Sequence, residues 1–312
     1  MSRPIPVAVA ADPRRRTLAA GDLKAVFLPS HGMLCASLRH RGVELLRRVE
    51  DLDGAAARGG TAGIPLLHPW ANRLSGLRYR AAGREVVLDR GSALLHLDER
   101  GQPIHGVPWP RLRWDVRETE ADRMAARLDW NRDELLAVFP FPHRLDLAVS
   151  VEDGTLAYEV NLTAGEDGPV PVAFGFHPYL GLPGAPREAW RLATPALRRL
   201  AVDPRGIPTG ASEEAPPLDE PLAARVLDDG FALDALPATF SLSDGALRID
   251  VEFLEGFSHA QLFAPPGEPL VAIEPMTAPV AALSSGQSLR VVEAGGTFRA
   301  TFRVRVRDQG AA

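Results

Sequence analysis

The sequence predicts an all-β protein built as a large sandwich of antiparallel sheets. Alternating apolar and polar residues recur along most of the chain, and helical periodicity is nearly absent. The 28 glycines and 28 prolines punctuate short segments, as they do where turns connect strands. With 312 residues and 46% hydrophobic content the chain can bury a sizeable core, for which a sandwich is more economical than a small barrel. We expect one domain over residues 1–312, because no linker-like stretch divides the sequence.

Four segments show the strand pattern most clearly. They are residues 112–130, 145–162, 247–253 and 298–306. The first two each contain two alternating runs around a polar turn, and the turn of the second is Asp153-Gly154, a pair that favours tight hairpins. Because only one face of each run is apolar, we expect antiparallel strands with the other face in water.

The segments between these strands predict one short helix and several surface loops. Asp133 is placed to cap a helix over residues 133–139, which the following proline ends. Stretches rich in proline and glycine predict loops at 183–187, 204–221 and 265–269, of which the middle one is the longest.

Charge and cysteine content exclude several classes of partner and site. The net charge is −5 without a basic block, so we expect no nucleic-acid and no membrane partner. A single cysteine, Cys35, excludes a disulfide framework within the chain and a cysteine-based zinc cluster. The first 16 residues show no export signal, which predicts a cytoplasmic protein. Nucleotide, dinucleotide, zincin and hydrolase-elbow motifs are absent as well, so we expect a small, uncharged or weakly charged partner.

Five segments place polar residues among apolar or proline neighbours. They are GIPLLHPWANRLSG at 63–76, PIHGVPW at 103–109, FGFHPYLGL at 174–182, LDDGF at 227–231 and AIEPMTAP at 272–279. Such residues either satisfy one another in the core or form a site, so these segments hold the candidate functional groups.

The strongest candidates are His177 and Glu274. His177 precedes a proline, which favours an extended backbone and a position at a strand end. Glu274 ends an otherwise apolar strand, where an unpaired carboxylate would be costly to bury. The structural alternatives are a core histidine with one hydrogen bond and a salt bridge from Glu274 to an arginine. His31 and His68 stand in similar contexts, so context alone does not choose among the histidines.

Weaker candidates lie in the other segments. The rigid fork of Arg73 suits a carboxylate or vicinal hydroxyls. His105 precedes a glycine that permits close backbone approach, and Trp109 offers an apolar face for a sugar ring. Asp228 and Asp229 precede a glycine and could instead form an Asx turn.

Taken in order, the five segments resemble the aldose 1-epimerase family, the galactose mutarotases. The matching motifs are G-I-P-x-L-x-P-W-x-N-R-L, I-H-G, F-x-x-H-P-Y, L-D-x-x-F and I-E-P-M-T, spread from residue 63 to residue 279. The resemblance implies a β-supersandwich with a sugar bound in a cleft over one sheet. The sequence departs from the family at Val107, where many mutarotases have a second glycine, and at Pro178, where some have serine. These departures leave the identity of the aldose open.

The resemblance also implies a role for each matching residue. Glu274 would be the general base and His177 the general acid, while Arg73, His105, Asp228 and, less strongly, Asn72 would bind sugar hydroxyls. Anomer interconversion removes the proton from O1 while the ring oxygen O5 receives one, so an acid and a base must flank C1. A carboxylate is ionised at neutral pH, and nearby negative charge can keep a histidine protonated. This chemistry requires neither a metal nor an organic cofactor.

Two other functions stay open. A glycosidase would use Glu274 and a carboxylate of segment 227–231 at a separation of about 5–5.5 Å for retention or about 6.5–9.5 Å for inversion. A sugar-binding or regulatory protein would keep the cleft without turnover, although the presence of both His177 and Glu274 argues against it.

Overall fold

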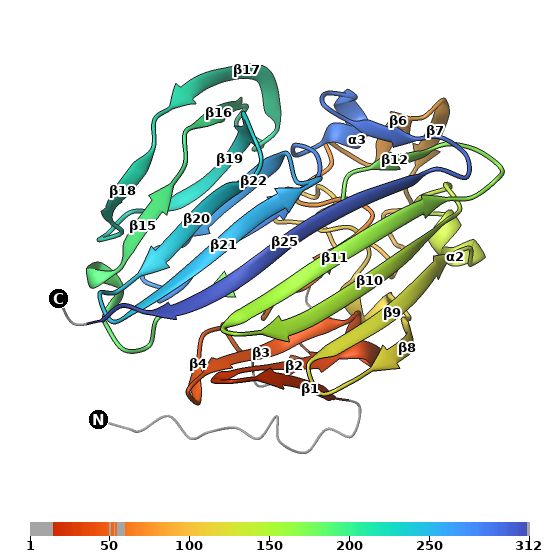
Figure 1. The fold of residues 1–312 in the computed structure, drawn as a ribbon. Coiled ribbons are helices and arrows are strands. Elements are labelled where there is room, and N and C mark those ends of the chain that lie inside the picture. Colours follow the sequence, from red (N-terminus) through yellow and green to blue (C-terminus); the bar gives the residue numbers. More distant parts are fainter. Residues whose placement is uncertain (1–14, 50, 53, 55–59, 311–312) are drawn as a thin grey trace.

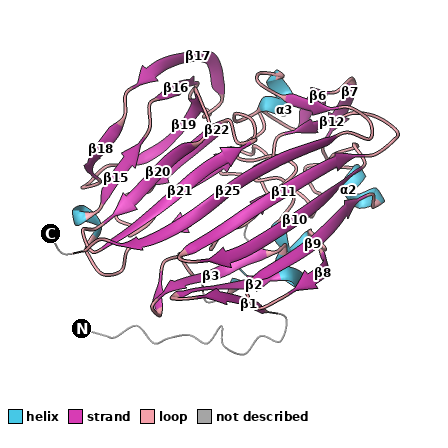
Figure 2. Ribbon diagram, viewed as in Figure 1, coloured by secondary structure: helices cyan, strands magenta, loops and turns pink. Residues whose placement is uncertain are grey.

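Antiparallel sheets make up nearly all of the regular structure, as the sequence predicts (Figure 1, Figure 2). The computed structural model describes residues 15–49, 51, 52, 54 and 60–310. The segment without an export signal lies almost wholly outside the described residues, and the single-domain prediction reaches beyond them at both ends. In the described part no helix is long and apolar enough to cross a membrane.

The larger sheet has nine strands in the order β18-β15-β20-β21-β25-β11-β10-β9-β8. Its strands are β8 (Asp115–Thr119), β9 (Arg123–Trp130), β10 (His143–Glu152), β11 (Thr155–Ala164), β15 (Arg191–Thr194), β18 (Leu218–Pro221), β20 (Ala238–Ser243), β21 (Leu247–Glu255) and β25 (Thr297–Asp308). Figure 1 shows these strands side by side across the molecule. Every second side chain of β11 is buried, so one face packs on the core and the other faces solvent. The predicted strands at 145–162, 247–253 and 298–306 are confirmed.

The second sheet has eight strands in the order β17-β16-β19-β22-β23-β13-β5, with β14 also paired to β23. They are β5 (Leu66–Leu67), β13 (Gly175–Phe176), β14 (Tyr179–Leu180), β16 (Leu197–Val202), β17 (Pro208–Ala215), β19 (Leu227–Leu233), β22 (His259–Ala264) and β23 (Val271–Met276). Leu262 and Ile273 of its central strands belong to the main core cluster. Since neighbouring residues of a strand face opposite ways, Gln261 and Glu274 lie on the other face, which carries the site described below.

Smaller elements complete the described fold. They are β1 (Arg16–Ala20), β2 (Leu23–Leu28), β3 (Leu34–His40) and β4 (Val43–Glu44) in one sheet, the pairs β6 (Arg78–Ala81) with β7 (Arg84–Val87) and β12 (Val170–Val172) with β24 (Arg290–Val292), the helices α2 (Asp133–Leu136) and α3 (Ala282–Ser285), and the 3-10 helices Pro29–His31, Trp109–Arg111 and Arg187–Ala189. The four-stranded sheet lies beside the β8–β10 end of the large sheet, as Figure 1 shows.

Aromatic side chains join the two large sheets in the core. The ring of Tyr158 on β11 stacks on Phe302 of β25, with centroids 4.6 Å apart. Phe176 of the smaller sheet packs on the same Phe302 ring at 4.9 Å. All three side chains are fully buried, and aromatic burial of this extent dominates core energetics.

The predicted loop over 204–221 is wrong, because β17 and β18 occupy most of it. Both strands form sheet edges and expose nearly all their side chains, so they show no apolar alternation. Proline is tolerated where an edge strand begins, as at Pro208. The loop predicted at 265–269 is confirmed between β22 and β23, and 183–187 is irregular up to Arg187, where a 3-10 helix begins.

Two boundaries also differ from the prediction. The helix begins at Asp133 as expected but ends at Leu136, and its N-cap is Arg132, without a side-chain capping bond. The hairpin within 112–130 is confirmed, yet its first strand begins only at Asp115. Leu112 instead ends a 3-10 turn, which begins in a proline-containing segment that favours such a turn.

Candidate active site

A cleft of about 860 Å³ opens over the polar face of the eight-stranded sheet. Its lining includes Arg47, Thr61, Arg73, Asp98, His105, Tyr179, Asp228 and Phe263. Four of the five segments singled out in the sequence contribute to this lining or to the residues beneath it, although they lie far apart along the chain. The fifth, which contains Glu274, supplies the sheet strand at its base.

His177 and Glu274 meet beneath the cleft. His177 directly follows β13, which confirms its predicted place at a strand end. Glu274 does not end its strand, since β23 continues through Pro275 to Met276; here the proline removes one ladder donor without ending the strand. Gly175 of β13 pairs with Met276 of β23, and this pairing brings the two side chains together. His177 Nε2 lies 3.2 Å from Glu274 Oε1, and the side chains are only 5% and 2% exposed.

Several buried polar atoms around this pair have no hydrogen-bond partner among the residues that the structure describes. They are Glu274 Oε2, His177 Nδ1, His105 Nδ1 and Gln261 Oε1. Buried polar groups are almost always paired, and an unpaired one costs about 1–3 kcal/mol. Four such atoms in one place therefore indicate a surface shaped to bind a polar molecule.

Burial shifts the two groups toward their neutral forms. It raises the pKa of Glu274, the negative charge of Asp228 raises that pKa further, and Arg73 opposes both effects. Burial also lowers the pKa of His177, and His105 adds to this effect. Both shifts favour the neutral forms, a carboxylic acid beside a neutral imidazole, whereas the sequence analysis expected a carboxylate beside an imidazolium. Both arrangements hold one proton between the two residues.

Arg73 is held by two neighbours at the wall of the cleft. Its Nε donates to Asp98 Oδ2 at 2.7 Å, and its Nη1 donates to Asn72 Oδ1 at 3.2 Å. These bonds fix the guanidinium plane, while Nη2 has no hydrogen-bond partner among the described residues. Asn72 is 4% exposed and adopts φ +52°, a left-handed conformation that asparagine tolerates. Asn72 thus supports Arg73, and it lines a small adjoining pocket with Arg73 and Asp228 rather than the cleft itself.

His105 reaches the site through an unusual backbone turn. His105 and Gly106 have φ of +63° and +68°. A Cβ at Gly106 would lie 2.3 Å from the backbone oxygen of His68, so only glycine fits there, as the sequence suggested. The His105 ring meets the His177 ring edge-on with centroids 5.5 Å apart. Burial, Arg73 and His96 lower the pKa of His105 to about 3, so it is neutral at pH 7.

The two aspartates of segment 227–231 face opposite ways. Both lie in β19, so the alternative of an Asx turn is wrong. Asp228 faces the cleft and accepts a 2.7 Å hydrogen bond from Gln261 Nε2. Asp229 lies on the other face and pairs with Arg199 at 2.6 Å. Strand alternation therefore selects Asp228 as the candidate ligand.

Three residues near the pair escaped the sequence analysis. Tyr179 stacks on the His177 ring at 3.9 Å and 17°, and its hydroxyl bonds Thr61. Tyr179 stands in the same sequence motif as His177, so this motif could have identified it. Gln261 is a buried amide in an apolar strand, which predicts a buried partner. Asp98 gave no signal, because its contact with Arg73 joins residues far apart in the chain.

Trp109 does not provide the predicted face for a sugar ring. It is 4% exposed and packs in a separate small core cluster with Leu28 and Leu34. The aromatic side chains that line the cleft are instead Tyr179 and the half-buried Phe263.

Known proteins resemble the chain in sequence pattern and in fold. The sequence matches the family model described as aldose 1-epimerase over residues 15–305. The fold is similar to a galactose mutarotase-like protein from Clostridium acetobutylicum, with 17% identity, a TM-score of 0.81 and 94% of each chain covered. It is also similar to a GalM/aldose epimerase homologue from C. elegans, with 18% identity, a TM-score of 0.77 and 94% and 98% coverage of this chain and that one.

A third similar structure is the Slr1438 protein from Synechocystis sp. PCC 6803, with 25% identity, a TM-score of 0.75 and 95% and 96% coverage. No curated protein matches the sequence.

The family match spans most of the chain, and these neighbours share the all-β sandwich along nearly its whole length. The chain belongs to the aldose 1-epimerase family.

Proposed function

We propose that this protein is a cofactor-independent mutarotase that interconverts the α and β anomers of a free aldose. The observation that carries the proposal is the His177–Glu274 contact beneath a polar cleft, with unpartnered buried atoms around it. O1 and O5 of an aldose are bonded to the same carbon. Two groups in contact with each other can therefore reach both oxygens at once.

The reaction needs one proton taken and one proton given. In the proposed step Glu274 accepts the proton from O1 while His177 donates one to O5, so the C1–O5 bond breaks and an open-chain aldehyde forms. Rotation about the C1–C2 bond and reclosure by the reverse transfers give the other anomer. Each well-placed transfer contributes typically ~10²–10⁴-fold to the rate. The pair ends with the same single proton with which it started.

Sugar binding favours the charged form of the pair that this step requires. A sugar hydroxyl that donates to the unpartnered Glu274 Oε2 stabilises the carboxylate, because hydrogen bonds to a charged form favour that form. Arg73 acts in the same direction by lowering the pKa of Glu274. The shared proton then transfers from Glu274 Oε1 to His177 Nε2, two atoms that lie 3.2 Å apart. The substrate thus helps to generate the base and the acid that act on it.

The walls of the cleft suit an uncharged polyol. Arg73, neutral His105 and Asp228 present donors and acceptors to vicinal hydroxyls, while Phe263 and Tyr179 offer apolar faces to the ring. In this proposal Asn72 assists indirectly by holding Arg73. The partner is accordingly a small sugar.

The direct test is polarimetry on freshly dissolved α-glucose, α-galactose and several other aldoses, with and without protein. We expect faster mutarotation of at least one aldose, and unchanged activity after treatment with a chelator. Loss of activity with chelator and its recovery on addition of a metal ion would contradict the mechanism. Hydrolysis of nitrophenyl glycosides would instead favour a glycosidase, and tight sugar binding without turnover would favour a binding protein.

A further inference from the structure

A second pair of histidines lies in the core behind the cleft and takes no part in the proposed chemistry. His68 and His143 are 1% and 6% exposed, and their Nε2 atoms lie 2.9 Å apart. His68 follows β5 of the smaller sheet, and His143 is the first residue of β10 in the larger one. Their hydrogen bond is therefore a polar link between the two sheets.

The protonation of this pair follows from its partners. The backbone oxygen of Phe141 only accepts hydrogen bonds, so His143 Nδ1, at 2.6 Å, must carry a proton. In a neutral His143 the other nitrogen, Nε2, is then an acceptor. His68 must therefore donate from its Nε2, and its Nδ1, which is buried without a partner in the described part of the chain, is unprotonated. The geometry thus specifies one tautomer for each ring.

The surroundings of the pair keep both rings neutral. Trp130 stacks on His143 with centroids 5.4 Å apart, and His68 meets Trp130, Phe139 and Phe174 at 4.9, 6.3 and 6.1 Å. Among the described residues, the rings that contact the pair from β9, from the loop after α2 and from the segment before β13 are thus aromatic and uncharged. Burial lowers the pKa of both histidines, that of His143 to about 4. His143 lowers the pKa of His68 further, while the bond to the Phe141 oxygen partly opposes the lowering at His143.

The chain around His68 organises the backbone of the site. The oxygen of His68 accepts from the Val107 amide at 2.9 Å, and the oxygen of Asn72 accepts from the His105 amide at 2.8 Å. The oxygen of Pro65 accepts from the His177 amide at 3.1 Å. Segment 65–73 therefore holds both site histidines through main-chain bonds, and it carries Arg73 itself.

We propose that His68 and His143 are positioning residues, which hold segment 65–73 against the larger sheet so that Arg73 and His105 keep their places at the sugar. The inference rests on the proposed function. A hydrogen bond between two defined tautomers fixes distance and direction, whereas apolar side chains would fill the same space with several packings. Arg73 lies at the far end of segment 65–73 from Pro65, whose oxygen accepts the His177 amide directly. Loss of the His68–His143 hydrogen bond should therefore displace the sugar ligands more than the His177–Glu274 pair.

The first test measures the link without using activity. Histidine ring nitrogens in protein labelled with ¹⁵N-histidine should show His143 protonated at Nδ1 and His68 at Nε2, with neither ring titrating near pH 6.5. Hydrogen exchange should show protected amides at His105 and Val107 that lose protection in His143→Phe. The opposite tautomers, or unchanged protection in that variant, would overturn the proposal.

The second test is kinetic and uses matched variants. His143→Phe keeps an aromatic ring on Trp130 but removes the acceptor, and it should raise KM by about tenfold with kcat changed less than about threefold. His143→Gln retains an acceptor for His68 and a donor for Phe141, so it should stay within about threefold of wild type. The control His40→Leu removes another buried histidine, one that lies outside the cleft lining, and should leave KM unchanged.

A lower melting temperature with unchanged KM in His143→Phe would show a purely structural role and overturn the proposal. If that variant does not fold, the wild-type tautomers and the His143→Gln kinetics decide the matter. If the wild type has no mutarotase activity, the proposed function fails on its own. The dissociation constant for a sugar, or failing that the amide protection, then tests positioning instead of KM.

Discussion

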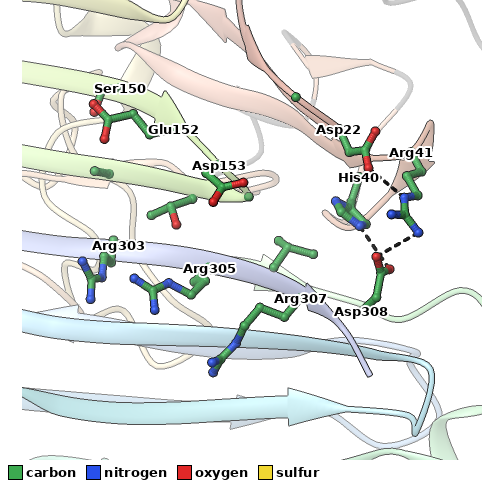
Figure 3. Close-up of a pocket in the computed structure, with 15 residues that line it drawn as sticks. Asp22, His40, Arg41, Ser150, Glu152, Asp153, Arg303, Arg305, Arg307 and Asp308 are labelled. Atoms are coloured by element: carbon green, nitrogen blue, oxygen red, sulfur yellow. Dashed lines mark hydrogen bonds and ion pairs between the residues drawn. The ribbon is translucent and has the colours of Figure 1, made fainter. Parts of the chain in front are cut away.

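Two large hollows in the described part of the molecule differ in how their polar groups are arranged. The cleft over the smaller sheet has a volume of about 860 Å³, and a depression on the outer side of the larger sheet has about 930 Å³. The outer depression is lined by charged residues that include Asp22, His40, Arg41, Glu152, Asp153, Arg303, Arg305, Arg307 and Asp308. Figure 3 shows Arg303, Arg305 and Arg307 in a row along β25. Size and charge alone would favour the outer depression.

The difference lies in how the polar groups are partnered. In the outer depression Arg41 pairs with Asp22 and Asp308 at 2.8 Å each (Figure 3). Arg303 pairs with Glu252. The side chains of Arg41 and Asp22 are more than half exposed, and exposed pairs contribute only about 0–1 kcal/mol. In the cleft, by contrast, His177 and Glu274 are almost fully buried, and four unpartnered buried atoms lie around them, against one, His40 Nδ1, among the described residues that line the outer depression. The cluster of unpartnered buried atoms, rather than volume or charge, distinguishes the cleft.

The largest expected effect is on the reaction itself. Glu274→Gln keeps the shape of the side chain but cannot accept the O1 proton, so kcat should fall by at least ~10²-fold. The matched change Glu152→Gln in the outer depression should leave kcat and KM at wild-type values. Polarimetric rates of both variants, measured on the same sugar, compare their kcat and KM. A folded Glu274→Gln protein that binds sugar and keeps near-wild-type kcat would place the base elsewhere.

The stability of the folded state should depend on pH through its buried histidines. Burial lowers the pKa of several histidines, which include His68, His105, His143, His177 and His259. The unfolded chain binds protons on these groups below about pH 6.5 while the folded one does not, so stability is present above that pH and is lost as pH falls. Each ring that stays neutral at pH about 5 contributes about 2 kcal/mol of destabilisation there.

Urea unfolding at pH about 7 and about 5, at low and high salt, measures this effect. Salt screens exposed ion pairs, so the change in stability between low and high salt should be smaller than the change between the two pH values. Glu274 acts in the opposite direction, because its raised pKa makes the folded state lose stability as pH rises. The histidines outnumber it, so the net expectation is loss of stability in acid. Equal stability at both pH values would contradict the neutral assignment of the buried rings.

The same contrast explains what the sequence could predict. Strands such as β11 and β25 have one buried and one solvent-facing side, and this difference is visible in the alternation of apolar and polar residues along them. The edge strand β17 is exposed on nearly every residue, so nothing in its local pattern distinguishes it from a loop. Local pattern reports burial, and an element without a buried face gives little signal.

The site was predictable where its chemistry is local. His177 and Glu274 stand out because polar groups in apolar segments require an explanation, and the family resemblance supplied their roles. The partner of Arg73 was not predictable, since Asp98 meets it only through the fold. The direction in which the pKa of Glu274 shifts was not predictable either, because it depends on burial and on Asp228, which sequence spacing does not reveal.

A smaller effect is expected at the wall of the cleft. Arg73→Lys keeps the charge but removes the planar fork that Asp98 and Asn72 hold in place, so KM should rise by about tenfold. Arg305→Lys in the row along β25 provides the control and should not change KM. Initial rates over a range of sugar concentrations separate KM from kcat. Equal behaviour of the two variants would remove Arg73 from the sugar site.

The smallest effect gives the sharpest comparison, because it concerns adjacent residues on opposite faces of one strand. Asp228→Asn keeps the size of the side chain and its bond from Gln261 but weakens acceptance from sugar hydroxyls, so KM should rise by about threefold. It also removes a negative charge that raises the pKa of Glu274, which should ease ionisation of the base and keep kcat near its wild-type value. Asp229→Asn breaks only the pair with half-exposed Arg199 and should leave both constants unchanged. A larger KM change in Asp229→Asn than in Asp228→Asn would mean that the face of β19 assigned to the sugar is the wrong one.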